Sequence, residues 1–333
     1  MRLTPAMPTP VMTITTTGFL ATVAQIIILR ELLVVFYGNE LSAGLIFAGW
    51  LLWSGLGSGL AAKWASKLSA RTSLFRLMLV CLAALLPLAV FFIRASRIIW
   101  ALQDGELVSI GKMLLISVAV TGVFCPVSGA LFGICWAIYR NEGESQALWI
   151  YMGEALGSAA GGLIVYFVFL PYGSVFTTIW VTAGIGLIVA AWLFRPWWPA
   201  SSLRSGHLIW MTVSLMVVAM AAGGSRLDHL SRRWQWGPDL SAVHDTAFHN
   251  IAVLKKEHQL SVFISGLWCF SEPDRLSAEY GAHLALLQHP RPKSVLLLGG
   301  GIAGLLGELL KQPGIRDIDY VEPDPDFICL IKP

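Results

Sequence analysis

Long apolar stretches fill the first two-thirds of this sequence and restrict what it can fold into. A helix needs about 20 apolar residues to cross a bilayer, and 56% of the 333 residues are hydrophobic while only 13% are charged. This composition excludes an ordinary soluble globular protein. We therefore predict a multi-pass α-helical membrane domain over residues 1–222, with spans near Val11–Tyr37, Leu41–Ala62, Leu74–Ile93, Ile110–Tyr139, Ala147–Leu170, Ser174–Phe194 and Leu208–Ala222. The N-terminus has no charged region followed by a small-residue cleavage site, so we expect the first span to be retained.

The basic residues favour one orientation of these spans. Lys63, Lys67, Arg71 and Arg76 form the most basic loop, which the positive-inside rule places in the cytoplasm together with the N-terminus. Seven crossings would then leave the C-terminal part outside, beside a cluster of arginines. We therefore expect one crossing more or fewer, at the segment that Pro126 interrupts.

Polar residues inside the spans require partners, because an unpaired charge at bilayer depth is costly. Gln25, Arg30 and Glu31 lie in the first predicted span, and Glu154 lies in the fifth. We interpret them as structural pairs between helices, and a transport or quinone-binding role stays open.

Small residues predict where the helices approach one another closely. Glycines recur at helix-packing spacing at Gly55, Gly57, Gly59, Gly153, Gly157 and Gly161. We interpret both runs as packing surfaces between helices.

The composition changes after the last predicted span. Residues 223–243 are predicted as a juxtamembrane linker, and residues 244–292 as a small β unit followed by a helix. Within this unit, Asn250–Leu254 and Leu260–Ile264 have the pattern of a β-hairpin. In the helix predicted over Ala278–Gln288, Glu279 and His283 are four residues apart and share one face.

A strand, a glycine turn, a helix and a second strand follow between Ser294 and Glu322. Val295–Leu298 and Ile318–Val321 are the predicted strands, and Leu305–Leu310 begins the helix between them. Glycines let the backbone approach a ligand closely, and an acid after the second strand accepts hydrogen bonds from ribose hydroxyls. The pattern predicts a nucleoside-binding site formed by Gly299, Gly300, Gly301, Gly304 and Glu322, in an incomplete Rossmann-like α/β domain over residues 293–333.

Charge and cysteine spacing exclude two other kinds of site. The formal net charge of +3 is scattered, and no basic run predicts nucleic-acid binding. The five cysteines have no CxxC spacing, so neither a metal site nor a disulfide framework is predicted.

From about His244 onward the chain resembles the spermidine synthase (polyamine aminopropyltransferase) family. The resemblance depends on an ordered set of segments: Phe263-Ile-Ser-Gly266, His289-Pro-Arg-Pro-Lys293, Val295-Leu-Leu-Leu-Gly-Gly-Gly301, Leu309-Leu-Lys-Gln-Pro313 and Tyr320-Val-Glu-Pro-Asp324. The first span, with Leu29-Arg-Glu-Leu-Leu33 and Phe36-Tyr-Gly38, is similar to the membrane half of bacterial proteins that fuse such a domain to a multi-span N-terminus.

The resemblance implies a methyltransferase-type Rossmann-like fold and transfer of an aminopropyl group from decarboxylated S-adenosylmethionine to a small amine. It places the donor at the glycine turn and Glu322. It implies substrate binding by Glu279 and His283, which equally suit an exposed pair on a helix face. It also implies a multi-pass protein of the bacterial inner membrane with a cytoplasmic soluble domain, with the lipid bilayer and a homo-oligomer as further partners.

The chain departs from the family pattern at four positions. Ser277 and Ala278 replace a Tyr-His pair, Trp268 replaces a glutamine, and Ile302 replaces an aspartate that would meet the donor's amine. The family's catalytic base is expected beyond Pro333, so we expect no catalysis by the sequence as given. Two alternatives stay open: a methyltransferase-like membrane protein that uses S-adenosylmethionine itself, and a non-enzymatic transporter or sensor with a degenerate nucleotide fold.

Overall fold

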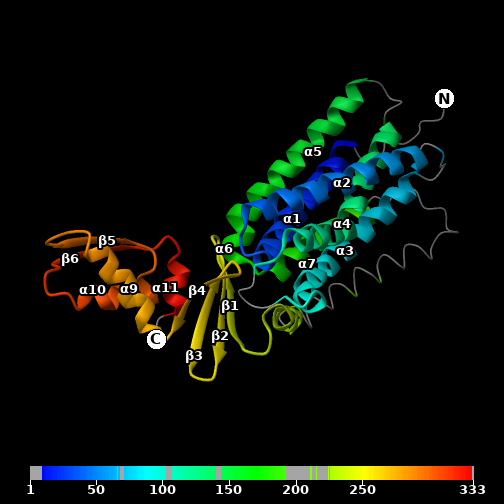
Figure 1. Ribbon diagram of the computed structural model, residues 1–333. Helices are drawn as coiled ribbons and strands as arrows, with labels where there is room; N and C mark the ends of the chain where they lie inside the picture. Colours follow the sequence, from blue (N-terminus) through cyan, green and yellow to red (C-terminus); the bar gives the residue numbers. More distant parts are fainter. Residues whose placement is uncertain are drawn as a thin grey trace, which may run out of the picture. The chain divides into compact units, whose positions relative to one another are not determined.

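The computed structural model describes residues 10–65, 67, 71–102, 107–139, 144–192, 211, 215, 224 and 226–331 (Figure 1). The chain divides into two compact units, Met1–Gln235 and Trp236–Pro333. The first unit is helical, and the second carries all the strands of the described part of the chain.

Long helices make up the first unit. They are α1 (Pro10–Val35), α2 (Glu40–Ala65), α3 (Arg71–Ile99), α4 (Ile110–Tyr139), α5 (Glu144–Ile164) with its continuation through η2 (Val165–Phe169) and α6 (Leu170–Tyr172), and α7 (Val175–Trp192). Five described segments are long and apolar enough to cross a membrane: Met12–Val35, Glu40–Ala65, Ser73–Ile99, Ile110–Ile138 and Leu148–Tyr172. The first five predicted spans are therefore confirmed as helices of sufficient length and apolarity.

The last two predicted spans have different outcomes. The sixth corresponds to α7, whose apolar part, Val175–Ala191, is shorter than the other five. The seventh, Leu208–Ala222, lies outside the described residues except for Met211 and Leu215.

The segment that Pro126 interrupts is not divided into two helices, while the number of crossings stays a prediction. α4 runs without a break from Ile110 to Tyr139 with Pro126 inside it. A proline removes one backbone hydrogen bond, and neighbouring helices in a bundle can accommodate that loss. At this point the Pro126 carbonyl lies against Gly57 of α2.

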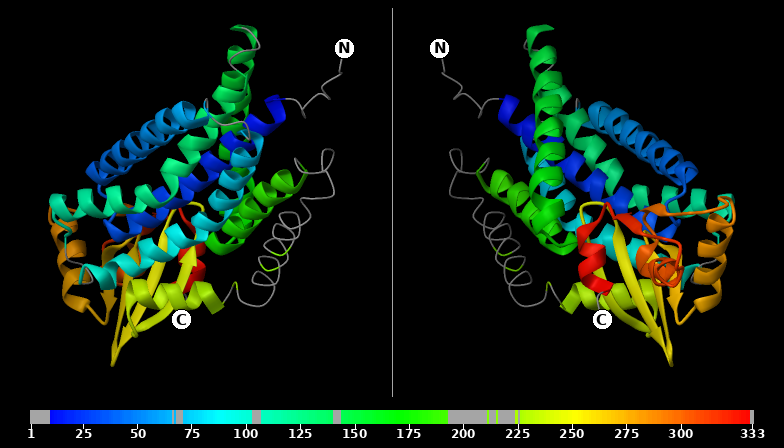
Figure 2. Two further views of the ribbon diagram at one scale, coloured as in Figure 1. Left: turned by 90° about the vertical axis from the view of Figure 1, so that its right-hand side faces the viewer. Right: turned by 90° about the vertical axis from the view of Figure 1, so that its left-hand side faces the viewer.

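α1 is the central helix of this unit. It contacts all the other long helices, α2, α3, α4, α5 and α7. α2 lies along α4 and α1 lies along α5, as both Figure 1 and Figure 2 show. One apolar core connects these helices, and it includes Ile28, Leu32, Leu82, Phe124 and Ile179.

Glycines form close contacts between the helices, and several of them are glycines that the sequence pattern predicted. A Cβ added at Gly57 would overlap the Pro126 carbonyl, and one added at Gly157 would overlap the Thr15 carbonyl of α1. Gly161 also faces α1, at Phe19. Among the described residues, Gly55 and Gly59 have no atom within 4 Å of an added Cβ, so the packing role of those two stays a prediction.

This packing predicts that Gly157→Leu destabilises the helical unit by about 1–3 kcal/mol, because an added side chain forces α1 and α5 apart. Thermal unfolding of the purified chain in detergent measures the loss. Gly162→Leu is the matched control, since Gly162 lies on the same helix with open space around an added Cβ. Equal losses in both variants would contradict the prediction.

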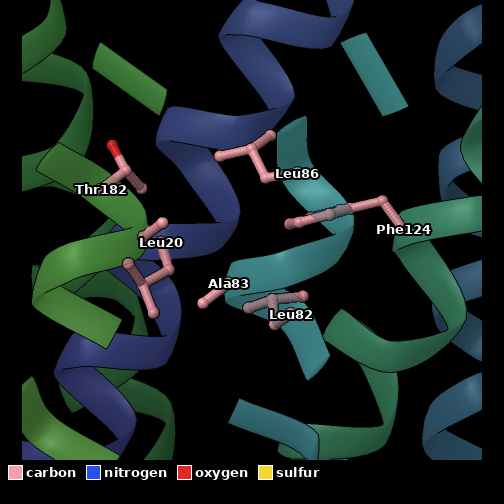
Figure 3. Close-up of a pocket in the computed structure, with 7 residues that line it drawn as sticks. Leu20, Leu82, Ala83, Leu86, Phe124 and Thr182 are labelled. Carbon is pink, nitrogen blue, oxygen red and sulfur yellow. The ribbon is translucent and has the colours of Figure 1, made fainter. Parts of the chain in front are cut away.

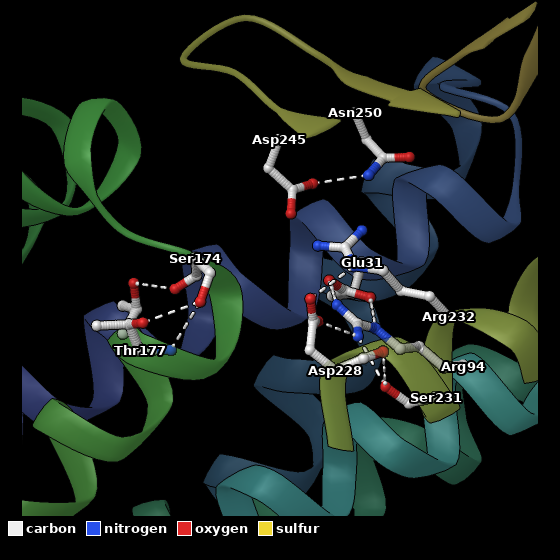
Figure 4. A network of polar contacts seen from close by, with 10 residues as sticks. Glu31, Arg94, Ser174, Thr177, Asp228, Ser231, Arg232, Asp245 and Asn250 are labelled. Carbon is white, nitrogen blue, oxygen red and sulfur yellow. Dashed lines mark hydrogen bonds and ion pairs between the residues drawn. The ribbon is translucent and has the colours of Figure 1, made fainter. Parts of the chain in front are cut away.

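A buried cluster of charged residues accounts for one polar group predicted in the spans. Arg94 of α3 is fully buried and donates two hydrogen bonds to Glu31 of α1, each 2.8 Å long. It also donates to Asp228 over 2.7 Å and to Ser231 over 2.8 Å, and Arg232 donates to the other Asp228 oxygen over 2.9 Å (Figure 4). The interhelical pairing predicted for Glu31 is therefore confirmed.

Asp228, Ser231 and Arg232 belong to a helix that the sequence analysis missed. Residues 226–236 are helical, although they lie in the predicted linker, and β1 begins inside the same predicted segment. Leu227, Leu230 and Trp234 have helical spacing, but this apolar pattern covers only two turns, and the buried residues Ser231 and Arg232 are polar.

A small apolar pocket lies between α1, α3, α4 and α7. Its lining includes Leu20, Leu82, Leu86 and Phe124, with Thr182 as the polar residue (Figure 3). The Thr182 hydroxyl already donates to the Thr178 carbonyl over 2.7 Å. The lining therefore presents no charge, and the pocket does not support the transport interpretation.

The second unit begins with a four-stranded antiparallel sheet in the order β1-β2-β3-β4. The strands are β1 (Leu240–Asp245), β2 (Asn250–Lys256), β3 (Gln259–Ile264) and β4 (Leu267–Glu272). The predicted hairpin is confirmed as β2 and β3, with Ile251 opposite Ile264. β1 was not predicted as a strand, because its first four residues were assigned to the linker and its last two to the start of the β unit.

The rest of this unit has the predicted order of elements: α9 (Arg275–Leu286), β5 (Ser294–Leu298), the turn η4 (Gly301–Ala303), α10 (Leu305–Leu310), β6 (Asp317–Val321) and α11 (Pro325–Ile331). β5 and β6 are parallel neighbours with Leu298 opposite Val321. This β-α-β arrangement confirms the predicted strands and the helix between them, whereas a larger doubly wound Rossmann-like sheet stays a prediction.

Candidate functional site

The glycine turn after β5 depends on backbone conformations that other residues adopt at a cost. Gly299, Gly300 and Gly304 have φ angles of +69°, +71° and +92°, a left-handed region that strains residues with a Cβ. The Gly299 N–H donates to the Val321 carbonyl over 2.9 Å, which attaches the turn to the end of β6. The turn is thus held beside the residue that follows Val321, which is Glu322.

Gly301 is required for a different reason. It is buried, and an added Cβ would lie 2.7 Å from a ring carbon of Tyr320. Only a residue without a side chain lets this ring lie against the turn.

Tyr320 connects the turn to the acid. Its hydroxyl donates a 2.8 Å hydrogen bond to Glu322 Oε2, because residues two apart on a strand point to the same side. Burial and then the hydrogen bond and charge of Glu322 raise the pKa of Tyr320 to about 12, while hydrogen bonds from the backbone of Gly301 and Ile302 act in the opposite direction. The phenol hydroxyl therefore lies between the two parts of the predicted nucleoside site.

Two further residues border Glu322. Burial and the nearby charge of Glu322 raise the pKa of Cys269 on β4. Asp324 is buried, its Oδ2 accepts a 2.6 Å hydrogen bond from the Thr246 hydroxyl, and its Oδ1 accepts one from the Asp326 N–H at the start of α11. Sequence reasoning missed Tyr320 and Cys269, although the two-residue alternation along β6 was a usable signal for Tyr320.

The Ile302 side chain takes part in core packing. Its side chain packs against the core formed by Ile251, Val253, Val262, Phe270 and Phe327. Ile302, which stands where the family has an aspartate, thus packs the glycine turn against the four-stranded sheet.

The helix α9 meets the glycine turn through small residues. An added Cβ at Gly304 would lie 3.0 Å from the Ala278 methyl group. Asp274 caps the helix by accepting from the Ser277 N–H and hydroxyl, and these hydrogen bonds lower the pKa of Asp274. Glu279 and His283 are exposed. Their substrate-binding role therefore stays a prediction without added support from geometry.

Comparison with known proteins agrees with the β-α-β site. Residues 276–333 match the model of the spermine/spermidine synthase domain. The chain carries a domain of the spermidine synthase family. No solved structure matches this chain.

Curated relatives of this spermidine synthase domain are named polyamine aminopropyltransferases. One from Streptomyces coelicolor is 26% identical over 244 residues, which covers 70% of this chain and 42% of the relative. One from Oceanobacillus iheyensis is 25% identical over 223 residues, covering 66% of this chain and 42% of the relative. One from Bacillus subtilis is 33% identical over 88 residues, covering 26% and 32%. The chain thus spans about two-fifths of the length of the first two relatives, and both alignments extend into the helical unit because they are longer than the second unit.

Proposed function

We propose that this chain is the membrane-anchored part of an aminopropyltransferase that binds decarboxylated S-adenosylmethionine at the glycine turn and Glu322. The observation that carries the proposal is the attachment of the turn to the end of β6, through the Gly299 hydrogen bond to Val321, directly before Glu322. It lies inside the segment that matches the family domain.

Each part of the proposed site has a chemical task. The Glu322 carboxylate accepts hydrogen bonds from the ribose hydroxyls, and the glycine backbone lets the nucleoside lie close to the sheet. The amine lone pair then attacks the methylene carbon bonded to the sulfonium. The carbon–sulfur bond breaks with its electrons on sulfur, a thioether nucleoside leaves, and the attacking amine loses a proton. The protein's contribution is to orient the two reactants.

The five long apolar helices support membrane anchoring. We further propose a bacterial inner membrane location with the second unit in the cytoplasm, where nucleoside donors and small amines occur. We also propose that the chain forms a homo-oligomer.

Of the two alternatives, use of S-adenosylmethionine itself keeps its argument from the missing family aspartate. Ile302 stands at that position, packs against the core and supplies no carboxylate for the donor's amine. The transporter alternative has no supporting observation in the apolar pocket of the helical unit.

Nucleoside binding tests the proposal. Calorimetry on the full chain in detergent should show binding of 5′-methylthioadenosine, the thioether nucleoside that aminopropyl transfer releases. Its 2′,3′-dideoxy counterpart should bind at least about tenfold more weakly, because hydrogen bonds to a charged group contribute about 1.5–3 kcal/mol each. Tighter binding of S-adenosylmethionine than of its decarboxylated form would favour the methyltransferase alternative. Binding of none of these nucleosides would overturn the proposal.

A further inference from the structure

The Tyr320 hydroxyl engages the carboxylate to which the proposed function assigns a ribose. Its ring lies against Gly301, and its hydroxyl donates to Glu322 Oε2 over 2.8 Å. The backbone of Gly301 and Ile302 also acts to lower the pKa of this hydroxyl. We name this set of contacts the Tyr320 bridge.

The bridge uses the groups that a nucleoside would need. One Glu322 oxygen is engaged by Tyr320, and the other lies 3.5 Å from the Asp324 backbone nitrogen. A ribose with two adjacent hydroxyls needs both carboxylate oxygens for a bidentate contact, and carboxylates present their lone pairs in that geometry.

We propose that the Tyr320 hydroxyl competes with the ribose for Glu322 in the ligand-free chain and sets donor affinity, because its hydrogen bond to Glu322 has to break before a nucleoside binds. This inference rests on the proposed function. Tyr320 is only partly buried and Val321 beside it is exposed, so the end of β6 has open space at its surface.

The bridge is a competitor and not a pH switch. The pKa of Tyr320 is raised to about 12, so the hydroxyl stays protonated and able to donate throughout the neutral range. Competition therefore depends on ligand concentration. The apparent affinity falls as fewer chains have the bridge open, since Kd,app equals the intrinsic Kd divided by the fraction of chains in which it is open.

The test uses Tyr320→Phe in the full chain in detergent, with 5′-methylthioadenosine as the probe. Phenylalanine keeps the ring against Gly301 and removes the hydroxyl. We expect binding about tenfold tighter than in the parent chain, which corresponds to 1.4 kcal/mol. Tyr280→Phe is the matched control, because Tyr280 lies exposed on α9 and its hydroxyl is outside the site.

Rapid-mixing kinetics provide a second readout. If the bridge has to open first, Tyr320→Phe raises the association rate and leaves the dissociation rate nearly unchanged. Unchanged affinity in Tyr320→Phe overturns the inference. Weaker binding with faster dissociation also overturns it and identifies Tyr320 as a residue that positions Glu322. Failure of the parent chain and of both variants to bind any nucleoside would instead overturn the proposed function.

Discussion

Replacing Arg94 with methionine should destabilise the helical unit by about 3–5 kcal/mol, the cost of removing one partner of a buried ion pair. Arg94 is fully buried and donates to Glu31, Asp228 and Ser231 (Figure 4). Methionine fills much of the same volume but leaves the Glu31 and Asp228 carboxylates facing each other without the charge between them. Thermal or denaturant unfolding in detergent measures the loss.

Arg233→Met is the matched control for this prediction. Arg233 lies exposed on the same helix as Asp228, so its loss should change stability by less than about 0.5 kcal/mol. The pair of replacements Glu31→Leu and Arg94→Leu should cost less than Arg94→Met alone, because it removes a charge of each sign. Similar stability of the Arg94→Met and Arg233→Met chains would contradict the assignment.

The Arg94 cluster illustrates what the sequence can predict about such a unit. Glu31 stood out because an acid in an apolar span requires a partner, but its partner Arg94 is 63 residues away, and Asp228, which Arg94 also contacts, is 134 residues beyond Arg94. Periodicity indicates which side of a helix is buried and does not identify the facing residue. The predicted third span ended at Ile93, one residue before Arg94, and Asp228 was assigned to a linker.

Local patterns were sufficient for the β-α-β segment. The runs Val295–Leu298 and Ile318–Val321 lie within β5 and β6, and α10 covers Leu305–Leu310, where the helix was predicted to begin. These elements depend on contacts between neighbours in the sequence. The position of Tyr320 between Gly301 and Glu322 depends on the register of two strands, which the sequence pattern does not specify.

Glu322→Gln should weaken binding of 5′-methylthioadenosine by about 100-fold, or about 3 kcal/mol, because a neutral amide replaces the charged acceptor of the ribose hydroxyls. The variant keeps the size of the side chain, so the fold of β6 and α11 should be unaffected. Asp319→Asn is the matched control, since Asp319 lies exposed on β6, three residues before Glu322.

The dideoxy counterpart separates a direct contact from a general loss of the site. Without ribose hydroxyls it has nothing to donate to Glu322, so it should bind the parent chain and Glu322→Gln with nearly the same low affinity. Calorimetry on both chains with both nucleosides forms a cycle whose coupling energy measures the ribose–carboxylate contact alone. A 100-fold loss for both nucleosides would mean that Glu322 supports the shape of the turn without binding ribose, since the damage would not depend on the hydroxyls.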